Sequence, residues 1–415
     1  MRVLWTAVLP LWLWGEGYGL QTIVEHAKKS NPMIVSAEHQ SSAKAMEREA
    51  AKSAFWPTLD IGASYARNNP NALVTPGEVT SGYVSASLEL YDGGRKSALL
   101  DAKAFAYKAS VFQKEAFEKS VTLRLIDSFY SVYKLKAMLG ALRSQSKELL
   151  EQLERMRRFN TAGLATREDI DKLVAVYENN RYLEESMKLN LETAMEQLRL
   201  QSGMEIATLS YSSIQEPKNI RFEPYEKQKI LQANADALEQ SARAAGAGYL
   251  PQLTLQHTYN RTDYDKLYEA GGFDTGAMLL DHQNKTTVSL NMRIFDHGKM
   301  SKEREALQYQ KLALDAEKEY AEREQRMQFR LSEKNLQTNR AKLKSARSEL
   351  KAAESTYRAV LTKFENGLVD NIAYLDALNK QTLAKARYDE TRYDYEIAKS
   401  VYYYYAGRDP GEYIR

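Results

Sequence analysis

Two stretches of about 65 residues each constrain what this chain can fold into. The first runs from Arg95 to about Asn160 and the second from Lys299 to about Asn366, and neither contains proline. As an α-helix, each stretch would be about 100 Å long, because a helix rises 1.5 Å per residue. An ordinary globular helix has only about 11–12 residues. The sequence therefore predicts an elongated helical structure instead of a compact globular domain.

Apolar residues in the first stretch recur at steps of three and four. This spacing is typical of a coiled-coil seam, so we expect each long helix to pack lengthwise against other helices. The seam residues are Phe105, Ala109, Phe112, Ala116, Leu123, Ile126, Tyr130 and Tyr133.

Composition narrows the classes of function. Of the 415 residues 27% are charged, and 58 Lys and Arg nearly balance 55 Asp and Glu. The two signs alternate along the helices, which indicates solvated helix surface and argues against nucleic-acid binding. The absence of cysteine excludes disulfides and thiolate chemistry. The histidines show no metal-ligand spacing and no nucleophile–base pattern occurs, so we expect neither an enzyme nor a cofactor.

The N-terminus has the pattern of a secretory signal peptide over residues 1–19. Its apolar core, Val3 to Trp14, is too short to span a membrane as a helix, and small residues follow it. We expect cleavage after Gly19, with Gly15 and Gly17 as alternatives. No other stretch has 18 consecutive apolar residues, so an exported chain of this kind would enter a membrane only as β-strands.

Four segments alternate between apolar and polar residues with a period of two. They cover about 57–67, 82–91, 251–261 and 286–295, and loops at 68–82 and about 261–285 join them into two hairpins. Each segment has about 9–11 residues, the length that crosses a bilayer when the strand is tilted. The apolar residues share one face and Ser, Thr, Gln and Asn share the other, which is typical of a sheet between lipid and water.

The chain repeats its organisation. Gly94 and Gly298 lie 204 residues apart, and so do Gly163 and Gly367, and Gly203 and Gly407. This constant offset predicts an internal duplication. The expected first repeat covers 20–217, with a long helix at 95–160 and a return helix at 166–202. The second covers 218–407, with the corresponding helices at 299–363 and 370–405, and 408–415 form a C-terminal tail.

Four strands per chain cannot close a barrel, and an open sheet edge is not tolerated in lipid. Several chains must therefore share one barrel. Three chains would supply twelve strands, and their long helices would continue the barrel as a coiled-coil tube. The expected fold class is thus an α+β membrane protein in which several chains share one β-barrel that a long α-helical barrel continues.

Several motifs, present in register and partly twice over, resemble the TolC-type outer-membrane channels, also called outer membrane factors. They are LELYDGG (88–94), RFNTAGLATREDI (158–170), MEQLRLQSG (195–203), KFENGLVDNIAYLDA (363–377) and the junctions FWP and YLP. The resemblance covers nearly the whole mature chain. It implies a homotrimer with a 12-stranded β-barrel, four strands per chain, in the outer membrane of a Gram-negative bacterium. Such a trimer would contact outer-membrane lipid and continue as an α-helical tunnel in the periplasm.

The resemblance also implies a function. Such a channel is the exit duct of a tripartite efflux pump or a type I secretion system, gated at its periplasmic tip. Its partners would be a periplasmic adaptor (membrane fusion) protein and, through it, an inner-membrane transporter. The adaptor would dock at the two helix turns, which here are Gly163, Leu164 and Ala165, and Gly367, Leu368 and Val369.

The family often carries two rings of aspartates at its aperture. The corresponding positions here are Ala373 and Asp376, so one ring is missing. Three copies of Asp376 near the threefold axis would concentrate negative potential and favour cations.

Polar links between the turn helices hold the family's closed state. The corresponding positions are Phe364 and Val369, facing Glu168 and Asp169. Phenylalanine has no hydroxyl and valine no charge, so the usual links cannot form from these residues. The aperture is then held by other contacts or rests less tightly closed.

The alternative interpretation is a periplasmic coiled-coil adaptor or a structural rod. Either would explain the signal peptide and the long helices, but neither explains four amphipathic strands. Within the channel interpretation, the sequence leaves the cargo open between drugs and proteins.

Overall fold

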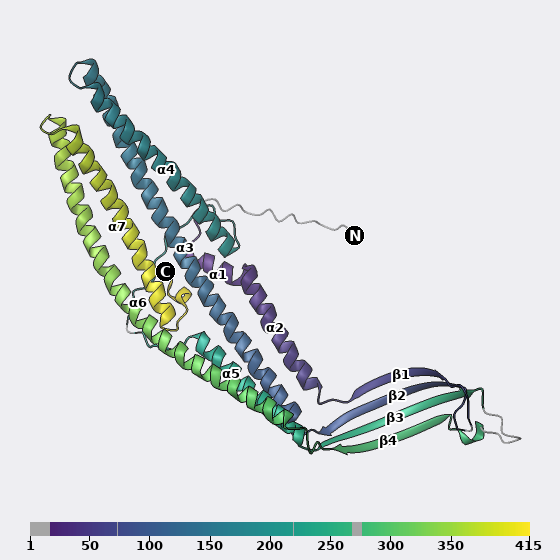
Figure 1. Cartoon of the computed structure of the whole chain (residues 1–415). Helices are drawn as coiled ribbons and strands as arrows, with labels where there is room; N and C mark the ends of the chain where they lie inside the picture. Colours follow the sequence, from purple (N-terminus) through teal and green to yellow (C-terminus); the bar gives the residue numbers. More distant parts are fainter. Residues whose placement is uncertain (1–16, 73, 219, 268–275) are drawn as a thin grey trace, which may run out of the picture. The chain divides into compact units, whose positions relative to one another are not determined.

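The computed structural model describes residues 17–72, 74–218, 220–267 and 276–415, and the arrangement of their helices and strands is seen in Figure 1. The signal peptide expected at 1–19 lies largely outside these residues. In chain order the elements are α1 (Leu20–Ser30), α2 (Pro32–Ser53), β1 (Thr58–Arg67), β2 (Glu78–Tyr91), α3 (Arg95–Thr161), α4 (Arg167–Ser202), α5 (Glu226–Gly246), η1 (Ala247–Tyr249), β3 (Gln252–Asp265), η2 (Gly276–Met278), β4 (His282–Asn291), α6 (Lys299–Glu365), α7 (Asn371–Tyr405) and η3 (Pro410–Tyr413).

The two longest helices, α3 and α6, have 67 residues each. Their bounds lie within two residues of those expected from the sequence. The first helical segment is divided at Asn31, directly before Pro32, because a residue preceding proline is disfavoured in helical conformation. Within the described ranges, none of the helices is both long and apolar enough to cross a membrane.

The described residues form two compact units. The first contains 17–38, 113–226 and 321–415, which include the α3–α4 turn and the α6–α7 turn. The second contains 39–112, 227–267 and 276–320, which include the whole β-sheet. The helices α2, α3, α5 and α6 contribute residues to both units, and each unit is described here by itself.

The main core of the first unit joins α1, α3 and α7 to the segment that follows α4. Leu20, Ile126 and Phe129 are completely buried in it. A buried ion pair fixes the connecting segment: the Glu396 carboxylate accepts the backbone N–H of Ile214 at 2.6 Å, and Lys399 donates to its carbonyl at 2.5 Å. These bonds satisfy both charges within a core where an unpaired charge would be costly.

The four strands form one antiparallel sheet in the order β1-β2-β3-β4. β1 and β4 are its outer strands, and among the described residues no strand pairs with the outer edge of either one. The strand bounds differ from the predicted ones at several ends. β2 begins at Glu78 instead of 82, β3 extends to Asp265, and β4 covers His282–Asn291 instead of 286–295. Toward the loops, backbone pairing therefore continues beyond the apolar alternation, whereas at the other end of β4 the alternation continues beyond the pairing.

The two faces of the sheet differ in polarity, as the alternation predicted. One face carries exposed apolar side chains such as Leu59, Ile61 and Leu290. On the other face Gln256 donates to Ser85 at 3.0 Å, and the Ser85 and Thr258 hydroxyls lie 3.1 Å apart. This polar face lines a hollow of about 490 Å³. A sheet with one apolar and one hydrogen-bonding face can separate lipid from water.

The sheet is joined to the long helices by two corners of the same construction. At the start of α3, the Asp92 carboxylate accepts the backbone N–H groups of Gly94 and Lys96 at 3.1 and 2.6 Å. At the start of α6, Asp296 accepts those of Gly298 and Met300, both at 3.0 Å. Each aspartate satisfies helix N–H groups that have no partner within the helix.

Candidate functional site

The first part of the candidate site is the α3–α4 turn, in the first unit. Gly163 has φ +72°, a left-handed conformation that favours glycine, and the backbone N–H of Leu164 donates to Phe159 O at 2.8 Å. Thr166 then caps α4 in a capping box with Asp169. The turn leaves the Leu164 side chain 76% exposed at the end of the hairpin, next to the half-buried Ala165.

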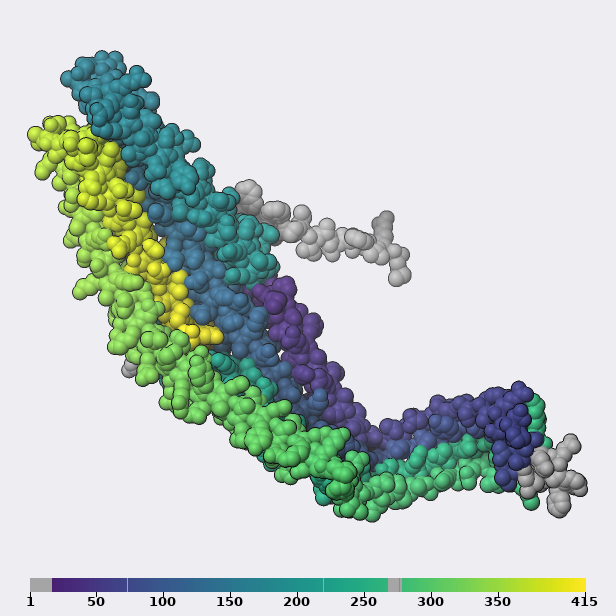
Figure 2. All heavy atoms as spheres, in the orientation of Figure 1, coloured from purple at the N-terminus to yellow at the C-terminus, as the bar shows by residue number. Residues whose placement is uncertain are grey.

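The α6–α7 turn is built in the same way. Gly367 has φ +71°, and Leu368 N–H donates to Lys363 O at 2.8 Å. Asp370 caps α7 by accepting the N–H of Ala373 at 2.9 Å. Leu368 is 73% exposed, whereas Val369 beside it is half-buried. Both hairpin tips, teal for α3–α4 and yellow-green for α6–α7, are open to solvent on the face seen in Figure 2. Each tip therefore presents one exposed leucine on a rigid turn.

The acidic residues expected at the aperture are held within the first turn of α4. Glu168 forms an ion pair with Lys172 at 2.6 Å. The Asp169 carboxylate accepts the Thr166 hydroxyl at 2.6 Å and the Thr166 backbone N–H at 3.2 Å. These hydrogen bonds, with the nearby Lys172 charge, hold the pKa of Asp169 below its usual value. Both carboxylates thus have partners on their own helix.

Phe364 lies in a different environment. Its ring stacks on Tyr374 of the same hairpin, with centroids 4.9 Å apart. Tyr374 is completely buried in a second core that joins the two hairpins below their tips. Tyr357 belongs to the same core, and its hydroxyl donates to Glu148 of α3 at 3.0 Å. The core residues are Leu149, Leu153, Met156, Leu173, Tyr357, Tyr374, Ala377 and Leu378.

Burial in this core raises the pKa of Tyr374 to about 12. The hydroxyl of Tyr374 and the side-chain oxygen of Gln152 have no hydrogen-bond partner of good geometry among the described residues. Sequence reasoning missed this aromatic cluster. Its one sequence signal is the spacing of Tyr357 and Phe364, which are seven residues apart and therefore share a face of α6.

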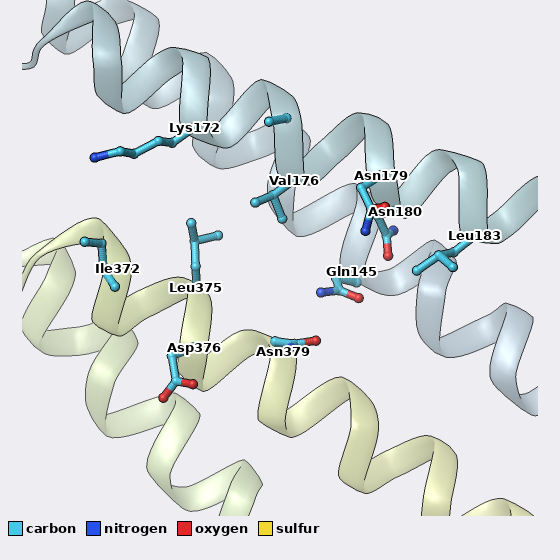
Figure 3. Close-up of a pocket in the computed structure, with 11 residues that line it drawn as sticks. Gln145, Lys172, Val176, Asn179, Asn180, Leu183, Ile372, Leu375, Asp376 and Asn379 are labelled. Atoms are coloured by element: carbon cyan, nitrogen blue, oxygen red, sulfur yellow. The ribbon is translucent and has the colours of Figure 1, made fainter.

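Asp376 lies in a groove of about 560 Å³ between α4 and α7. Its side chain is 58% exposed and pairs with Lys380, one turn further along α7, at 2.6 Å. Figure 3 shows Val176 and Asn180 of α4 above the groove and Leu375 pointing up from α7. The basic partner was not predicted, although its i,i+4 spacing could have indicated it. Ala373, the other expected aperture position, is half-buried and carries no charge.

Across the described ranges, no group of three or more His, Asp or Glu residues is placed to hold a metal ion. The predicted residues instead form two exposed turns, an acidic position beside an open groove, and a polar sheet face.

Comparison with known proteins agrees with this arrangement. The profile of the outer membrane efflux protein family matches residues 23–204 and 229–403. Outer membrane protein TolC of Escherichia coli is 26% identical over 398 residues, which cover 89% of this chain and 79% of TolC.

Solved structures show the same fold at lower identity. The CmeC outer membrane channel of Campylobacter jejuni superposes with a TM-score of 0.80 at 15% identity, covering 94% of this chain and 86% of CmeC. The outer membrane protein VceC of Vibrio cholerae gives 0.79 at 12% identity, covering 94% of this chain and 96% of VceC. Because the family profile matches most of the sequence, the chain belongs to the outer membrane efflux protein family and is an outer-membrane protein of a Gram-negative bacterium.

Proposed function

We propose that three copies of this chain form one channel through the outer membrane, continued by a helical tunnel in the periplasm. The channel is the passive exit duct of a tripartite efflux pump or a type I secretion system. The observation that carries this proposal is the four-stranded sheet, which has one apolar face, one polar face and two unpaired edges. In a protein of the outer membrane, such edges must be paired by other chains.

Exposed apolar residues on two helices support contacts between the chains. On α6, Tyr320 and Met327 are seven residues apart, and on α4 so are Tyr182 and Leu189. This spacing places each pair on one helix face, as in a coiled-coil seam that lacks its partner. Further exposed apolar residues on these helices are Tyr309, Leu312, Leu331 and Leu200.

An internal duplication would place six similar halves around the channel axis. It is supported by the backbone as well as by the sequence, because residues 204 apart adopt the same left-handed conformation. The four pairs are Gly93 and His297, Gly94 and Gly298, Gly163 and Gly367, and Gly203 and Gly407.

The aperture is assigned to the periplasmic tips. Three copies of Asp376 supply its negative charge, and Ala373 replaces a second acidic ring. Glu168, Asp169 and Val369 lie on the turns around it. The core in which Phe364 packs on Tyr374 takes the place of the usual polar links and holds the α6–α7 hairpin against the α3–α4 hairpin.

The periplasmic adaptor docks at the turns formed by residues 163–165 and 367–369. Their exposed leucines offer apolar contacts at the end of each hairpin, and the glycines fix the turn geometry. Through the adaptor the channel connects to an inner-membrane transporter, which determines the cargo.

The decisive experiment is the mass of the particle extracted from the outer membrane in detergent, by light scattering corrected for bound detergent. We expect three chains per particle, and discrete conductance steps when it is inserted into planar lipid bilayers. A single chain per particle, or recovery from the soluble periplasm, would favour the alternative of an adaptor or rod.

A further inference from the structure

The edge strand β4 stops before its amphipathic pattern does. Asn291 is its last residue because it pairs with Gln252, the first residue of β3. Beyond it, Met292 and Ile294 continue the apolar alternation and are 58% and 86% exposed. These residues have the pattern of a strand, but no strand among the described residues pairs with them.

We propose that β1 of one chain pairs with β4 of the next chain in a defined antiparallel register, with Ile61 opposite Leu290 of the next chain. This inference rests on the proposed trimer and specifies its contact in the membrane. Three constraints determine the register: the faces of the sheet, the depth of its apolar belt and the tilt of its strands.

The first constraint comes from the faces. Leu59, Ile61, Ala63 and Tyr65 lie on the apolar face of β1, and Val288 and Leu290 lie on that of β4. Neighbouring strands keep both faces uniform only if apolar positions are opposite apolar positions. Directly opposite residues of β1, β2, β3 and β4 form a row across one chain. Relative to this row, β1 of the next chain can therefore be shifted along β4 only by an even number of residues.

The second constraint is the depth of the apolar belt. The row through Ile61 passes Val84 and Tyr259 and ends at Asn284 of β4. The outward apolar residues begin only at Val288 of β4 and continue beyond the strand to Ile294, so the belt crosses the sheet diagonally. Because lipid-facing apolar residues lie at one depth, the strands must be tilted, and the next β1 must be shifted along β4.

The third constraint is the size of the tilt. At about 3.3 Å per residue and about 4.8 Å between strands, a slip of six residues over four strands gives a tilt of about 45°. Slips of four and eight give about 35° and about 55° by the same geometry. Strands of outer-membrane barrels tilt by about 35–45°, which excludes eight.

Belt depth decides between four and six. A slip of four sets Ala63 opposite Thr286 and Tyr65 opposite Asn284, which places polar side chains at the level of the apolar belt. A slip of six sets apolar residues of the two chains opposite each other at three successive outward positions. These pairs are Leu59 with Met292, Ile61 with Leu290, and Ala63 with Val288.

A slip of six residues also explains why the apolar alternation continues beyond Asn291, where β4 ends. It sets Thr58, the first residue of β1, opposite Arg293 of the next chain. The backbone of residues 292 and 293 then pairs with that chain, and β4 grows to nearly the length that its alternation predicts. The alternation in the sequence thus corresponds to the full length of β4 in the trimer, which one chain alone does not form.

The chain contains no cysteine, so engineered pairs can report the register directly. We would combine Ser64→Cys with Thr287→Cys, which the proposed register sets directly opposite each other on the polar face. The matched controls combine Ser64→Cys with Lys285→Cys or Ser289→Cys, which correspond to slips of four and eight. Directly opposite residues are about 4.5–5.5 Å apart at Cα, within disulfide range, and diagonal ones about 7–8 Å.

After mild oxidation of the detergent-extracted particle, denaturing non-reducing gels should show covalent trimers for the 64/287 pair and mainly monomers for both controls. Stronger cross-linking of either control, or no cross-linking in a particle of three chains, would overturn the register and leave the proposed channel intact. A particle of one chain, by light scattering of the same sample, would overturn both.

Discussion

Phe364 lies almost parallel on Tyr374, with ring centroids 4.9 Å apart and planes inclined by 18°. The pair closes the core that packs the α6–α7 hairpin against the α3–α4 hairpin. A stack of two apolar rings resists separation by excluding water and does not depend on charge. It therefore offers the proposed closed tip a contact that needs no polar link between the hairpins.

We predict that Tyr374→Ala loosens the tip. Removing a completely buried aromatic side chain leaves a cavity and costs about 3–5 kcal/mol. The basal conductance in planar bilayers should rise, and the apparent melting temperature should fall. Tyr374→Phe should leave both nearly unchanged, since the lost hydroxyl has no partner of good geometry among the described residues.

A matched control separates loosening of the tip from general destabilisation. Tyr403 is 1% exposed and lies in the other core of the same unit. Tyr403→Ala should lower the melting temperature by a similar amount without raising basal conductance. Equal conductance in the Tyr374 and Tyr403 variants would show that the second core, which joins the two hairpins, does not hold the tip closed.

The second prediction concerns charge at the aperture. If three copies of Asp376 line it, Asp376→Asn should weaken block by a multivalent cation such as La³⁺ by about tenfold, because the local negative potential is lost. Lys380→Ala should strengthen the block, since Lys380 pairs with Asp376 at 2.6 Å and offsets its charge. Block would be titrated in single-channel recordings.

The control for this prediction is Glu390→Gln. Glu390 is an exposed carboxylate on the same helix, about 20 Å further from the tip along α7. The Glu390→Gln substitution removes the same charge as Asp376→Asn but should leave the block unchanged. An equal effect of both substitutions would mean that Asp376 acts only through the net charge of the tunnel.

The lowered pKa of Asp169 predicts that the stability of the α4 N-terminus depends on pH. Its pKa is held below the usual value, so its hydrogen bonds to Thr166 stabilise the folded tip above the pKa of the unfolded chain, near 3.9. This contribution is lost as the pH falls through the lower folded value. Hydrogen exchange at residues 166–173, corrected for intrinsic rates, should become less protected as the pH falls below about 4.

In Asp169→Asn the same segment should change much less over that range, because the amide does not titrate. Identical pH profiles in the variant and the parent chain would show that another group is responsible. The ion pair of Glu168 with Lys172 is exposed and screened by solvent. Its removal should therefore change hydrogen exchange in this segment only slightly, and it serves as a comparison.

The exposed leucines of the two turns test the docking proposal. Leu164→Ser and Leu368→Ser should each change stability by no more than about 0.5 kcal/mol, since both side chains are mainly exposed. Together they should abolish export in cells and cross-linking to the adaptor, while conductance stays normal. Leu383→Ser, at an exposed leucine of α7 away from the turn, should leave export intact. Normal export in the double variant would contradict docking at these turns.

The helices could be predicted closely from the sequence, whereas the strand ends could not. Helix bounds follow from local signals, such as the left-handed Gly203 after α4 and the Asp92 cap before α3. Strand bounds depend on pairing with a distant strand. Glu78 pairs with Asp265, more than 180 residues away, and no local pattern predicts this.

The same limit applies to the candidate site. The two turns were predictable because glycine is required at positions 163 and 367 for a left-handed backbone. The packing around the predicted Phe364 was not, because residues such as Tyr357 and Glu148 come together only when the two hairpins pack. Alternation in the sequence reports which environment a side chain faces, but not which residue lies opposite.

The last prediction uses the two corners between sheet and helices. His297 has φ +57°, where the corresponding residue of the other half, Gly93, has φ +70°. A non-glycine residue in this conformation carries about 1–2 kcal/mol of steric cost. His297→Gly should therefore stabilise the chain by about 0.5–1 kcal/mol, after the entropy of glycine in the unfolded state and the lost contact with Phe295 are subtracted.

Gly298→Ala provides the opposite test at the neighbouring position. Its φ is +79°, and a new Cβ would meet no atom within 4 Å, so only the backbone conformation is strained. This variant should lose about 1–2 kcal/mol. Apparent melting temperatures of the detergent-extracted proteins should move in opposite directions. If His297→Gly also lowers the melting temperature, the imidazole contact with Phe295 outweighs the backbone strain, and His297 stabilises the corner instead of straining it.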